Sequence, residues 1–393
     1  MHPTRCPPND NNRVEHNDMT DFEDIRPYSD DEVEESVQRL LNDPEFIATI
    51  CAFRFKQLPR WFRPLLTPLV RRRLKKEIGH ISNVANLQTV ICDYLDRVIE
   101  SSTSQLTFSG LENLKPDEPY LFISNHRDIV MDPAFVNYAL YHNGFDTLQI
   151  AIGDNLLQKP FVSDLMRLNK SFIVKRSANG IREKMAAYLS LSRYIEHSIG
   201  EGSSIWIAQR EGRAKDGIDR TEPAIIKMLF MSHKKNDVKF SDYINKLKII
   251  PIAISYEYNP CDCRIAQELY YRQESGSYQK KPGEDMDSIA AGITGNKGDV
   301  HISFGTQLQG EFKDADTVAR EIDRQITQLY RLHSSNYLAA QITGLTNGLA
   351  QQISNTAKAD FEKRVNGCDE KFRGLLLQAY ANPLKCKREA GLN

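Results

Sequence analysis

Short apolar runs alternate with longer amphipathic stretches through the middle of the chain. Six runs are typical of buried strands, and they cover residues 120–124, 148–152, 172–174, 204–208, 248–255 and 300–304. Stretches of helix length separate most of these runs, at residues 133–141, 161–168, 181–199 and 224–231. Because strands that alternate with helices form βαβ units, the pattern predicts an α/β fold with a mixed, mainly parallel sheet flanked by helices.

Helical patterns also lie on both sides of this region. Apolar residues recur at helical spacing from residue 29, over 84–100 and over 316–332. We therefore expect a disordered acidic tail (1–28), a helical, basic N-terminal region (29–105), an α/β domain (106–310) and a helical C-terminal region (311–393). Residues 260–298 are interpreted as an insertion, and Pro251 inside an apolar run predicts a sheet edge, a strand start or a bulge.

The formal net charge of −1 hides two segments of opposite charge. The first 46 residues carry thirteen acids against four arginines, whereas residues 54–76 carry nine Lys or Arg and no acid. Without a global positive field, the chain is not expected to bind nucleic acid.

No apolar stretch reaches the roughly 18–20 residues that span a bilayer, and no apolar signal core follows Met1, so a cytoplasmic protein is expected. Five of the seven cysteines are scattered singly, so no disulfide framework is expected. Cys261 and Cys263 are the one close pair, but no second Cys or His pair lies nearby, so no metal site is expected there.

Groups that could perform chemistry follow the predicted strands, where open α/β sheets bind their ligands. His126 follows the first run, with Asp128 two residues later and Asp132 six residues later. An imidazole beside a carboxylate can act as a general base held in one tautomer. Asp132 is also expected to cap a helix that begins at Pro133, since Asp is a common N-cap and Pro a common first helical residue.

Two basic loops follow later strands. Arg176 comes just after the run at 172–174, and the loop after 204–208 contains Glu211, Gly212, Arg213 and Lys215. Arg can bind a phosphate through a bidentate fork, Lys binds it as a point charge, and glycine frees backbone N–H groups. A basic loop by itself is more often simply solvated, so the combination carries more weight than either loop.

In this order and spacing, four blocks of the chain resemble those of the glycerolipid acyltransferases, which include the glycerol-3-phosphate and 1-acylglycerol-3-phosphate acyltransferases. The family pattern is Asn-His-x4-Asp, a strand ending in Arg, Phe-Pro-Glu-Gly-Thr-Arg, and an apolar strand with Pro. The matching positions, within roughly residues 106–310, are Asn125-His126 with Asp132, Arg176, Glu211-Gly212 and Pro251. The chain departs from the pattern in three blocks. In the first block, five residues rather than four separate His126 from Asp132, and in the second block Lys170 replaces the opening glycine. In the third block, Gln209-Arg210 replace Phe-Pro, and Arg213 comes one position early.

The resemblance implies an O-acyltransferase of phospholipid synthesis. In such an enzyme, His126 would take the proton of an acceptor hydroxyl as it attacks a thioester carbonyl, and Asp132, or alternatively Asp128, would orient the imidazole. The donor would be an acyl-CoA or an acyl-carrier protein used as co-substrate, without a bound cofactor or metal. Two alternatives remain open, namely another alcohol or amine acceptor and a non-catalytic lipid-binding protein that keeps this fold.

The same resemblance gives the basic loops a role in acceptor binding. Arg176, with Arg213 or Lys215, would hold the phosphate of glycerol 3-phosphate or of 1-acylglycerol 3-phosphate. Glu211 would shape the loop or contact an acceptor hydroxyl, and backbone near Gly212 would face the developing oxyanion.

Residues 54–76 mix cations with aromatic and apolar side chains. Trp61 precedes a cluster of cations that consists of Arg71, Arg72, Arg73, Lys75 and Lys76. Segments of this kind bind anionic lipid surfaces through both apolar area and charge. We therefore expect a peripheral protein that docks on the cytoplasmic membrane face. The alternative is that these apolar residues pack beneath the catalytic domain and leave the cations in water.

Overall fold

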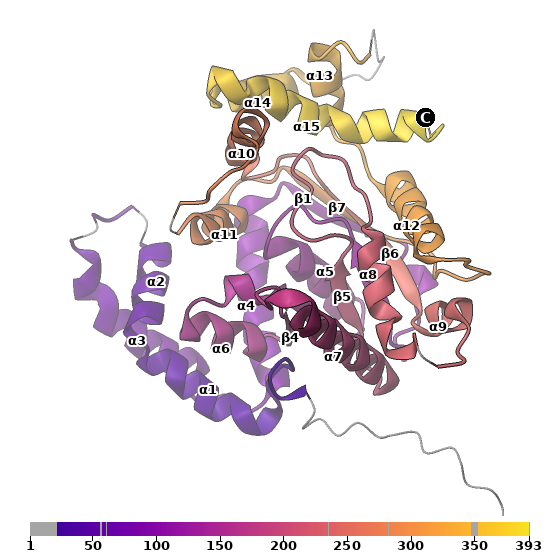
Figure 1. The fold of residues 1–393 in the computed structure, drawn as a ribbon. Coiled ribbons are helices and arrows are strands. Elements are labelled where there is room, and N and C mark those ends of the chain that lie inside the picture. Colours follow the sequence, from indigo (N-terminus) through magenta and orange to yellow (C-terminus); the bar gives the residue numbers. More distant parts are fainter. Residues whose placement is uncertain are drawn as a thin grey trace, which may run out of the picture.

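A seven-stranded sheet runs through the computed structural model, which describes residues 22–55, 57–59, 61–234, 236–281, 283–346 and 353–392 (Figure 1). The strands are β1 (Gln105–Ser109), β2 (Leu121–Ser124), β3 (Gln149–Gly153), β4 (Ser171–Val174), β5 (Ile205–Ala208), β6 (Ile249–Tyr256) and β7 (Asp299–Phe304). Their order is β1-β7-β6-β2-β5-β3-β4. All neighbouring strands are parallel except β6 and β7, which are antiparallel, so the predicted mixed, mainly parallel sheet is confirmed.

Two details of the sheet differ from the sequence prediction. Strand β1 was not predicted, because its sequence is not a continuous apolar run and both ends of the strand are exposed. Pro251 lies inside the central strand β6, not at an edge or at the start of a strand. Its carbonyl accepts a hydrogen bond from Gly305 at 2.8 Å, and the antiparallel pairing with β7 begins one residue later, at Ile252. The missing N–H of Pro251 therefore interrupts no bond of that ladder.

Alternation along the strands separates two apolar cores, one on each face of the sheet. Leu121 and Ile123 contact one core, to which helices α7 (Gly180–Gly200), α8 (Pro223–Leu229), α9 (Phe240–Lys246) and α12 (Ala315–Leu329) contribute. Phe122 contacts the other core, to which α4 (Val84–Ser102) and α5 (Met131–His142) contribute. The helices of the α/β region are α5 (Met131–His142), α6 (Pro160–Leu168), α7 (Gly180–Gly200), α8 (Pro223–Leu229), α9 (Phe240–Lys246), α10 (Asp262–Ser275), α11 (Glu284–Thr294) and α12 (Ala315–Leu329). Short 3-10 turns cover Leu111–Asn113, Asp154–Leu156 and Met231–His233.

The N-terminal helices form a third core with α6. They are α1 (Asp30–Asn42), α2 (Pro44–Arg54), α3 (Arg63–Ile78) and α4 (Val84–Ser102). The disordered tail predicted for residues 1–28 lies outside the described residues up to residue 21. Residues 22–28 depart from that prediction, since Phe22 and Ile25 are buried in the sheet's core and the Ile25 carbonyl accepts from Ile173 N at 2.8 Å.

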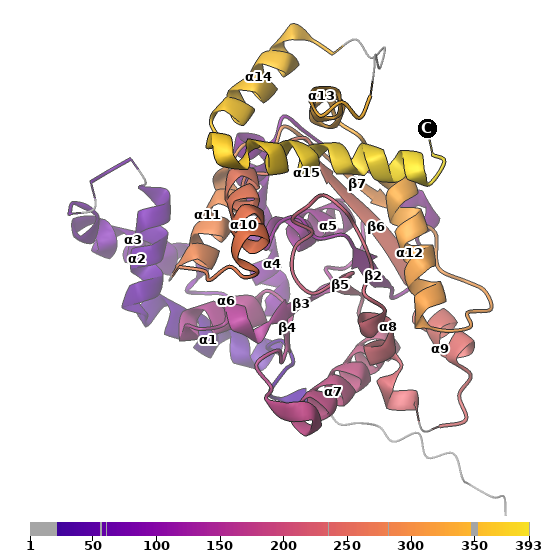
Figure 2. The same ribbon diagram turned by 45° about the horizontal axis from the view of Figure 1, so that its top comes forward.

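The C-terminal helices lie across one end of the molecule and pack on α10 (Figure 2). They are α13 (Ser334–Ile342), α14 (Asn355–Asn366) and α15 (Glu370–Glu389). The stretch at 260–298 forms α10 and α11 between β6 and β7, as an insertion would. Among the described residues, no helix combines the length and apolar character that a bilayer span requires.

Candidate active site

The loop after β2 is fixed to the neighbouring strand β6 by a buried amide. Asn125 Oδ1 accepts from Ile254 N at 2.7 Å, and Asn125 Nδ2 donates to Ile254 O at 2.9 Å. The amide side chain thus continues the hydrogen bonding to β6 beyond the end of β2, and it pairs with both the backbone N–H and the carbonyl of Ile254. His126 follows directly, so its backbone position is set by the central pair of strands.

His126 is paired with Asp132. The Nδ1 atom of the imidazole lies 2.8 Å from Asp132 Oδ2. The same oxygen accepts from Arg127 N at 2.6 Å and from Asp128 N at 2.9 Å, while Asp132 Oδ1 accepts from the Tyr256 hydroxyl at 2.6 Å. The carboxyl group is fully buried and fixed by four donors. Because Nδ1 faces Asp132, Nε2 is the ring nitrogen left to face a ligand.

Tyr256 belongs to the same buried cluster. Burial, together with the charges of Asp132 and Asp128, raises the pKa of Tyr256 well above its usual value. Its hydroxyl therefore remains a hydrogen-bond donor to Asp132 at any physiological pH.

The sequence left open whether Asp128 orients the imidazole of His126, but its carboxylate instead faces the start of α5. Its Oδ1 accepts from Val130 N at 3.0 Å and from Met131 N at 2.9 Å, so it caps the start of α5. The expectation that Asp132 caps a helix beginning at Pro133 is wrong, because α5 begins at Met131 and Asp132 lies inside its first turn. Within the part of the chain that the structure describes, no hydrogen bond joins Asp128 to His126. Burial and then the charge of Asp132 raise the pKa of Asp128.

An aromatic ring supports the imidazole from the side. Trp206 of β5 meets His126 edge to face, with ring centroids 5.7 Å apart. The Trp206 Nε1–H donates to Ser124 Oγ at 3.0 Å, which fixes the indole in the core. The imidazole is therefore restrained by a carboxylate and by a large apolar surface.

Arg127 holds the next loop over this site. Its guanidinium is 2.7 Å from Asp219 Oδ2 and also donates to the carbonyls of Ala214 and Gly217, each at 3.3 Å. Ala214 N in turn donates to the His126 carbonyl at 2.8 Å. These contacts pin the loop that carries the predicted cations against the histidine loop.

The predicted cations differ in their exposure and in the partners with which they already interact. Arg176 is partly exposed, and its Nη1 lies 3.8 Å from Glu211 Oε1 on the opposite loop. Arg213 Nη1 is buried and, among the described residues, has no hydrogen-bond partner. Lys215 forms an ion pair with the buried Glu268 of α10. Gly212 adopts a positive φ of 74°, the left-handed region that glycine tolerates at the least cost.

One cavity of about 420 Å³ connects these groups. His126, Arg176, Glu211, Gly212, Arg213 and Lys215 all line it, so the structure brings the predicted catalytic and acceptor residues together. Its other walls are largely apolar and include Ile91, Leu95, Ile150, Leu191, Ile195 and Met228. A cavity with a few polar groups on a mainly apolar lining is typical of a ligand site.

Several residues of this site were missed by the sequence interpretation. They are Tyr256 and Trp206, which hold Asp132 and His126, Arg127 with Asp219, and Arg210, which also lines the cavity. Arg127 directly follows His126 and Arg210 directly precedes Glu211, and these two adjacencies were the available signals. The roles of Tyr256, Trp206 and Asp219 depend on tertiary contacts that no local pattern reveals.

The predicted docking residues lie apart from the cavity, on and near α3. Val70, Leu74 and Ile78 face the protein, whereas Trp61 is 75% exposed and Leu65 68% exposed. Arg71, Arg72, Arg73, Lys75 and Lys76 are all exposed. Arg73 pairs with Glu77 at 2.7 Å, and Arg71 donates to Asn42. Trp61 and Leu65 therefore do not pack beneath the catalytic domain.

Comparison with known proteins relates part of the chain to acyltransferases. Residues 105–255 match the family model described as Acyltransferase. The curated glycerol-3-phosphate acyltransferase of Pseudoalteromonas atlantica is 23% identical over 304 residues, which cover 72% of this chain and 35% of the relative. The glycerol-3-phosphate acyltransferase of Alteromonas mediterranea is 26% identical over 188 residues, which cover 48% of this chain and 21% of the relative. The chain thus spans about a third or less of the length of these relatives. A solved structure, the 1-acyl-sn-glycerophosphate (LPA) acyltransferase PlsC from Thermotoga maritima, is 12% identical with a TM-score of 0.36, covering 71% of this chain and 91% of that chain. Residues 105–255 are therefore similar to the acyltransferase domain family, and the chain as a whole is similar to glycerol-3-phosphate acyltransferases.

Proposed function

We propose that this protein transfers a fatty acyl group from a thioester donor to a hydroxyl of glycerol 3-phosphate or 1-acylglycerol 3-phosphate. The observation that carries the proposal is the His126–Asp132 pair, 2.8 Å apart, in an apolar cavity that also contains the unpartnered guanidinium nitrogen of Arg213. A general base, an apolar chamber and a cation are the three elements that such a reaction needs.

His126 Nε2 removes the proton of the acceptor hydroxyl while the hydroxyl oxygen attacks the thioester carbonyl carbon. Asp132 keeps the other proton on Nδ1 and stabilises the imidazolium that forms. When the tetrahedral intermediate collapses, the C–S bond breaks and the imidazolium returns its proton to the leaving thiolate. No covalent acyl-enzyme is required, and backbone N–H groups near Gly212 are the candidates to face the oxyanion.

Arg213 and Arg176 bind the acceptor phosphate in this proposal. Arg213 Nη1 is buried without a hydrogen bond among the described residues, and a buried cationic donor without a partner favours an anionic ligand. Arg176 reaches the same cavity from the other loop, and its guanidinium forms an ion pair with Glu211 at 3.8 Å. Lys215 contributes less, because Glu268 already neutralises it.

The apolar walls of the cavity accommodate the acyl chain. Each buried methylene stabilises the bound chain by about 0.8 kcal/mol, so a long chain supplies enough binding energy to hold the thioester near His126. Both acyl-CoA and acyl-carrier protein are compatible with this arrangement. The relatives are named glycerol-3-phosphate acyltransferases, which favours glycerol 3-phosphate as the acceptor.

The decisive experiment is a radiolabelled acyl-transfer assay with both donors. The acceptors are glycerol 3-phosphate, 1-acylglycerol 3-phosphate and an unphosphorylated alcohol. We expect transfer to a phosphorylated acceptor, and a loss of at least about a hundredfold in His126→Ala, the usual scale for a positioned acid–base group. His80→Ala, which alters an exposed histidine elsewhere, should keep full activity. If the folded protein transfers no acyl group but binds lipid, the non-catalytic alternative is correct.

We further propose that the enzyme works as a peripheral protein on the cytoplasmic membrane face, docked through α3. The exposed Trp61 and Leu65 beside the basic cluster at 71–76 support this role. Each cation near an anionic surface contributes about 1 kcal/mol, so changing the three arginines at 71–73 to Gln should weaken vesicle binding by up to roughly a hundredfold at low salt.

Vesicle co-sedimentation tests the docking proposal. A matched control replaces three exposed lysines of α14 and α15, at 358, 363 and 371, by Gln and should bind as the wild type does. Equal binding to neutral and anionic vesicles would contradict the electrostatic part of the proposal.

A further inference from the structure

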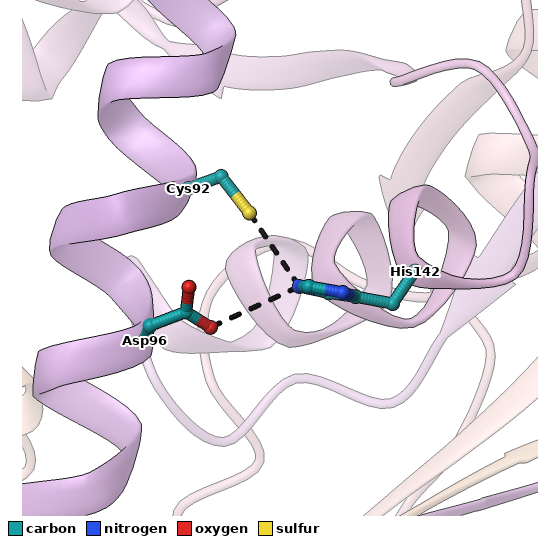
Figure 3. Close-up of side chains that lie close together, drawn as sticks. All are labelled: Cys92, Asp96 and His142. Atoms are coloured by element: carbon teal, nitrogen blue, oxygen red, sulfur yellow. Dashed lines mark hydrogen bonds and ion pairs between the residues drawn. The ribbon is translucent and has the colours of Figure 1, made fainter.

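Helices α4 and α5 bring together a thiol, a carboxylate and an imidazole away from His126. Cys92 and Asp96 lie one turn apart on α4, and His142 is the last residue of α5; in Figure 3 the three side chains point toward one another. Their ligand atoms all lie within 4.8 Å of one another. Sulfur, nitrogen and oxygen donors of this kind together match the ligand set of zinc.

Two of the three distances between ligand atoms are close to the edges of a tetrahedral site. Cys92 Sγ lies 3.5 Å from His142 Nε2, and His142 Nε2 lies 3.8 Å from Asp96 Oδ1. For zinc bonds of about 2.3 Å to sulfur and about 2.0–2.1 Å to nitrogen and oxygen, tetrahedral angles place S and N about 3.6 Å apart and N and O about 3.4 Å apart. These two distances therefore need to change by only a few tenths of an ångström, and the ligand atoms of Cys92 and Asp96 lie within 4.8 Å of each other.

Two tyrosines of α5 pack against the imidazole of His142. The ring centroid of Tyr138 lies 4.2 Å from that of His142. Tyr141 meets the same imidazole edge to face at 5.5 Å. The shell of side chains around a metal site helps to orient its ligands. His142 also ends α5, where the helix dipole favours a cation.

We propose that Cys92, Asp96 and His142 bind a zinc ion, with water as the fourth ligand. Such an ion ties α4 to α5, and Cys92, Tyr138 and Tyr141 all line the wall of the acyltransferase cavity. The first turn of α5 carries Asp132, so the ion braces the helix that also positions the histidine's partner. The site does not depend on the proposed acyl transfer.

Cobalt titration of the untagged, full-length, metal-stripped protein tests this site, because Co²⁺ takes up zinc sites and reports thiolate ligation by a charge-transfer band. We expect one Co²⁺ per chain, a thiolate band, and displacement by Zn²⁺. Cys92→Ser should abolish the band, and Cys92→Ser or His142→Gln should weaken binding by at least about a hundredfold.

Matched controls separate this site from casual metal binding. Asp93→Asn removes a neighbouring exposed charge on α4, and Cys386→Ser removes a partly buried thiol elsewhere; both should bind as the wild type does. A melting temperature that zinc raises in the wild type and not in Cys92→Ser is the second expected result. The proposal is overturned if Cys92→Ser binds as tightly as the wild type, or if no saturable binding is seen below about 100 μM.

Discussion

Replacing Asp132 by Asn removes a charge at the centre of the site while keeping its shape. The native carboxylate accepts from His126, from the backbone N–H groups of Arg127 and Asp128, and from Tyr256. The single carbonyl oxygen of Asn can keep the first three contacts, and its NH₂ group can donate to the Tyr256 hydroxyl oxygen, which then accepts. The loop should therefore stay folded in this variant.

The expected loss of activity follows from the lost charge. In the proposed transition state His126 becomes an imidazolium. Its charge centre lies about 4 Å from that of a carboxylate in hydrogen-bond contact, and at an effective dielectric constant of about 20 the attraction between them is worth about 4 kcal/mol. Each 1.36 kcal/mol is a factor of ten in rate, so kcat should fall about a thousandfold. The Michaelis constants should change little, because the charge develops only in the transition state.

The assay is the initial rate of acyl transfer at saturating donor, with a thermal melt of each variant as the folding control. Asp128→Asn is the matched control, since its amide oxygen can still cap α5 and it has no hydrogen bond to His126. Tyr256→Phe should lose a few-fold to about tenfold, the value of one hydrogen bond to Asp132. A folded Asp132→Asn variant with more than about a tenth of the wild-type kcat, or an inactive but folded Asp128→Asn variant, would refute the reasoning.

The other predictions concern the acceptor site and the stability of the fold. Arg213→Gln should raise the acceptor Michaelis constant at least about tenfold, because a charge-assisted hydrogen bond is worth about 1.5–3 kcal/mol, and should leave the donor constant nearly unchanged; an unchanged acceptor constant would argue for an acceptor without phosphate. Lys215→Gln should affect the acceptor constant less than Arg213→Gln and destabilise the protein more, since Lys215 is paired with the buried Glu268; melting curves and kinetics of the two variants decide this. Burial, followed by the charge of Arg331, lowers the pKa of His333 from its usual 6.5 to about 4. Between those two pH values the unfolded chain binds a proton that the folded chain does not, so the free energy of unfolding should fall as the pH falls, by up to about 3 kcal/mol, and His333→Asn should flatten that dependence in urea titrations. An equally steep pH dependence in the variant would assign the effect to other groups.

The sequence predicted the sheet well because six of its strands are continuous apolar runs. It missed β1, which has no such run. It also assigned residues 22–28 to a disordered tail, because two apolar residues, Phe22 and Ile25, are too few to stand out as a pattern. Each is nevertheless buried, since the edge strand β4 leaves backbone groups and apolar surface for residues 22–28 to cover. Local periodicity cannot report a contact made with a strand about 150 residues away.

The sequence also placed the candidate site without fixing its internal geometry. It identified His126 and offered two acids, and the choice between them depends on backbone N–H groups that no residue pattern reveals. Asp128 turns its side chain to the start of α5, which leaves Asp132 facing the imidazole. Similarly, Cys92 and His142 are fifty residues apart in the sequence and approach each other only because α4 packs beside α5. Tertiary packing, not spacing, creates both arrangements.

The C-terminal helices bear directly on the candidate site through one loop. Gly217 has a positive φ of 77°, and a Cβ atom at this position would lie 2.0 Å from the Ala379 carbonyl of α15, so the loop and the helix touch backbone to backbone. Asn382 of α15 also donates to the Asp216 carbonyl at 2.7 Å. From this loop the chain of contacts continues through the Gly217 carbonyl to Arg127, whose backbone N–H holds Asp132. Because these contacts link α15 step by step to Asp132, α15 acts as the outer support of the loop that carries Arg213, and the helical region beyond residue 311 is part of the structure that positions the site.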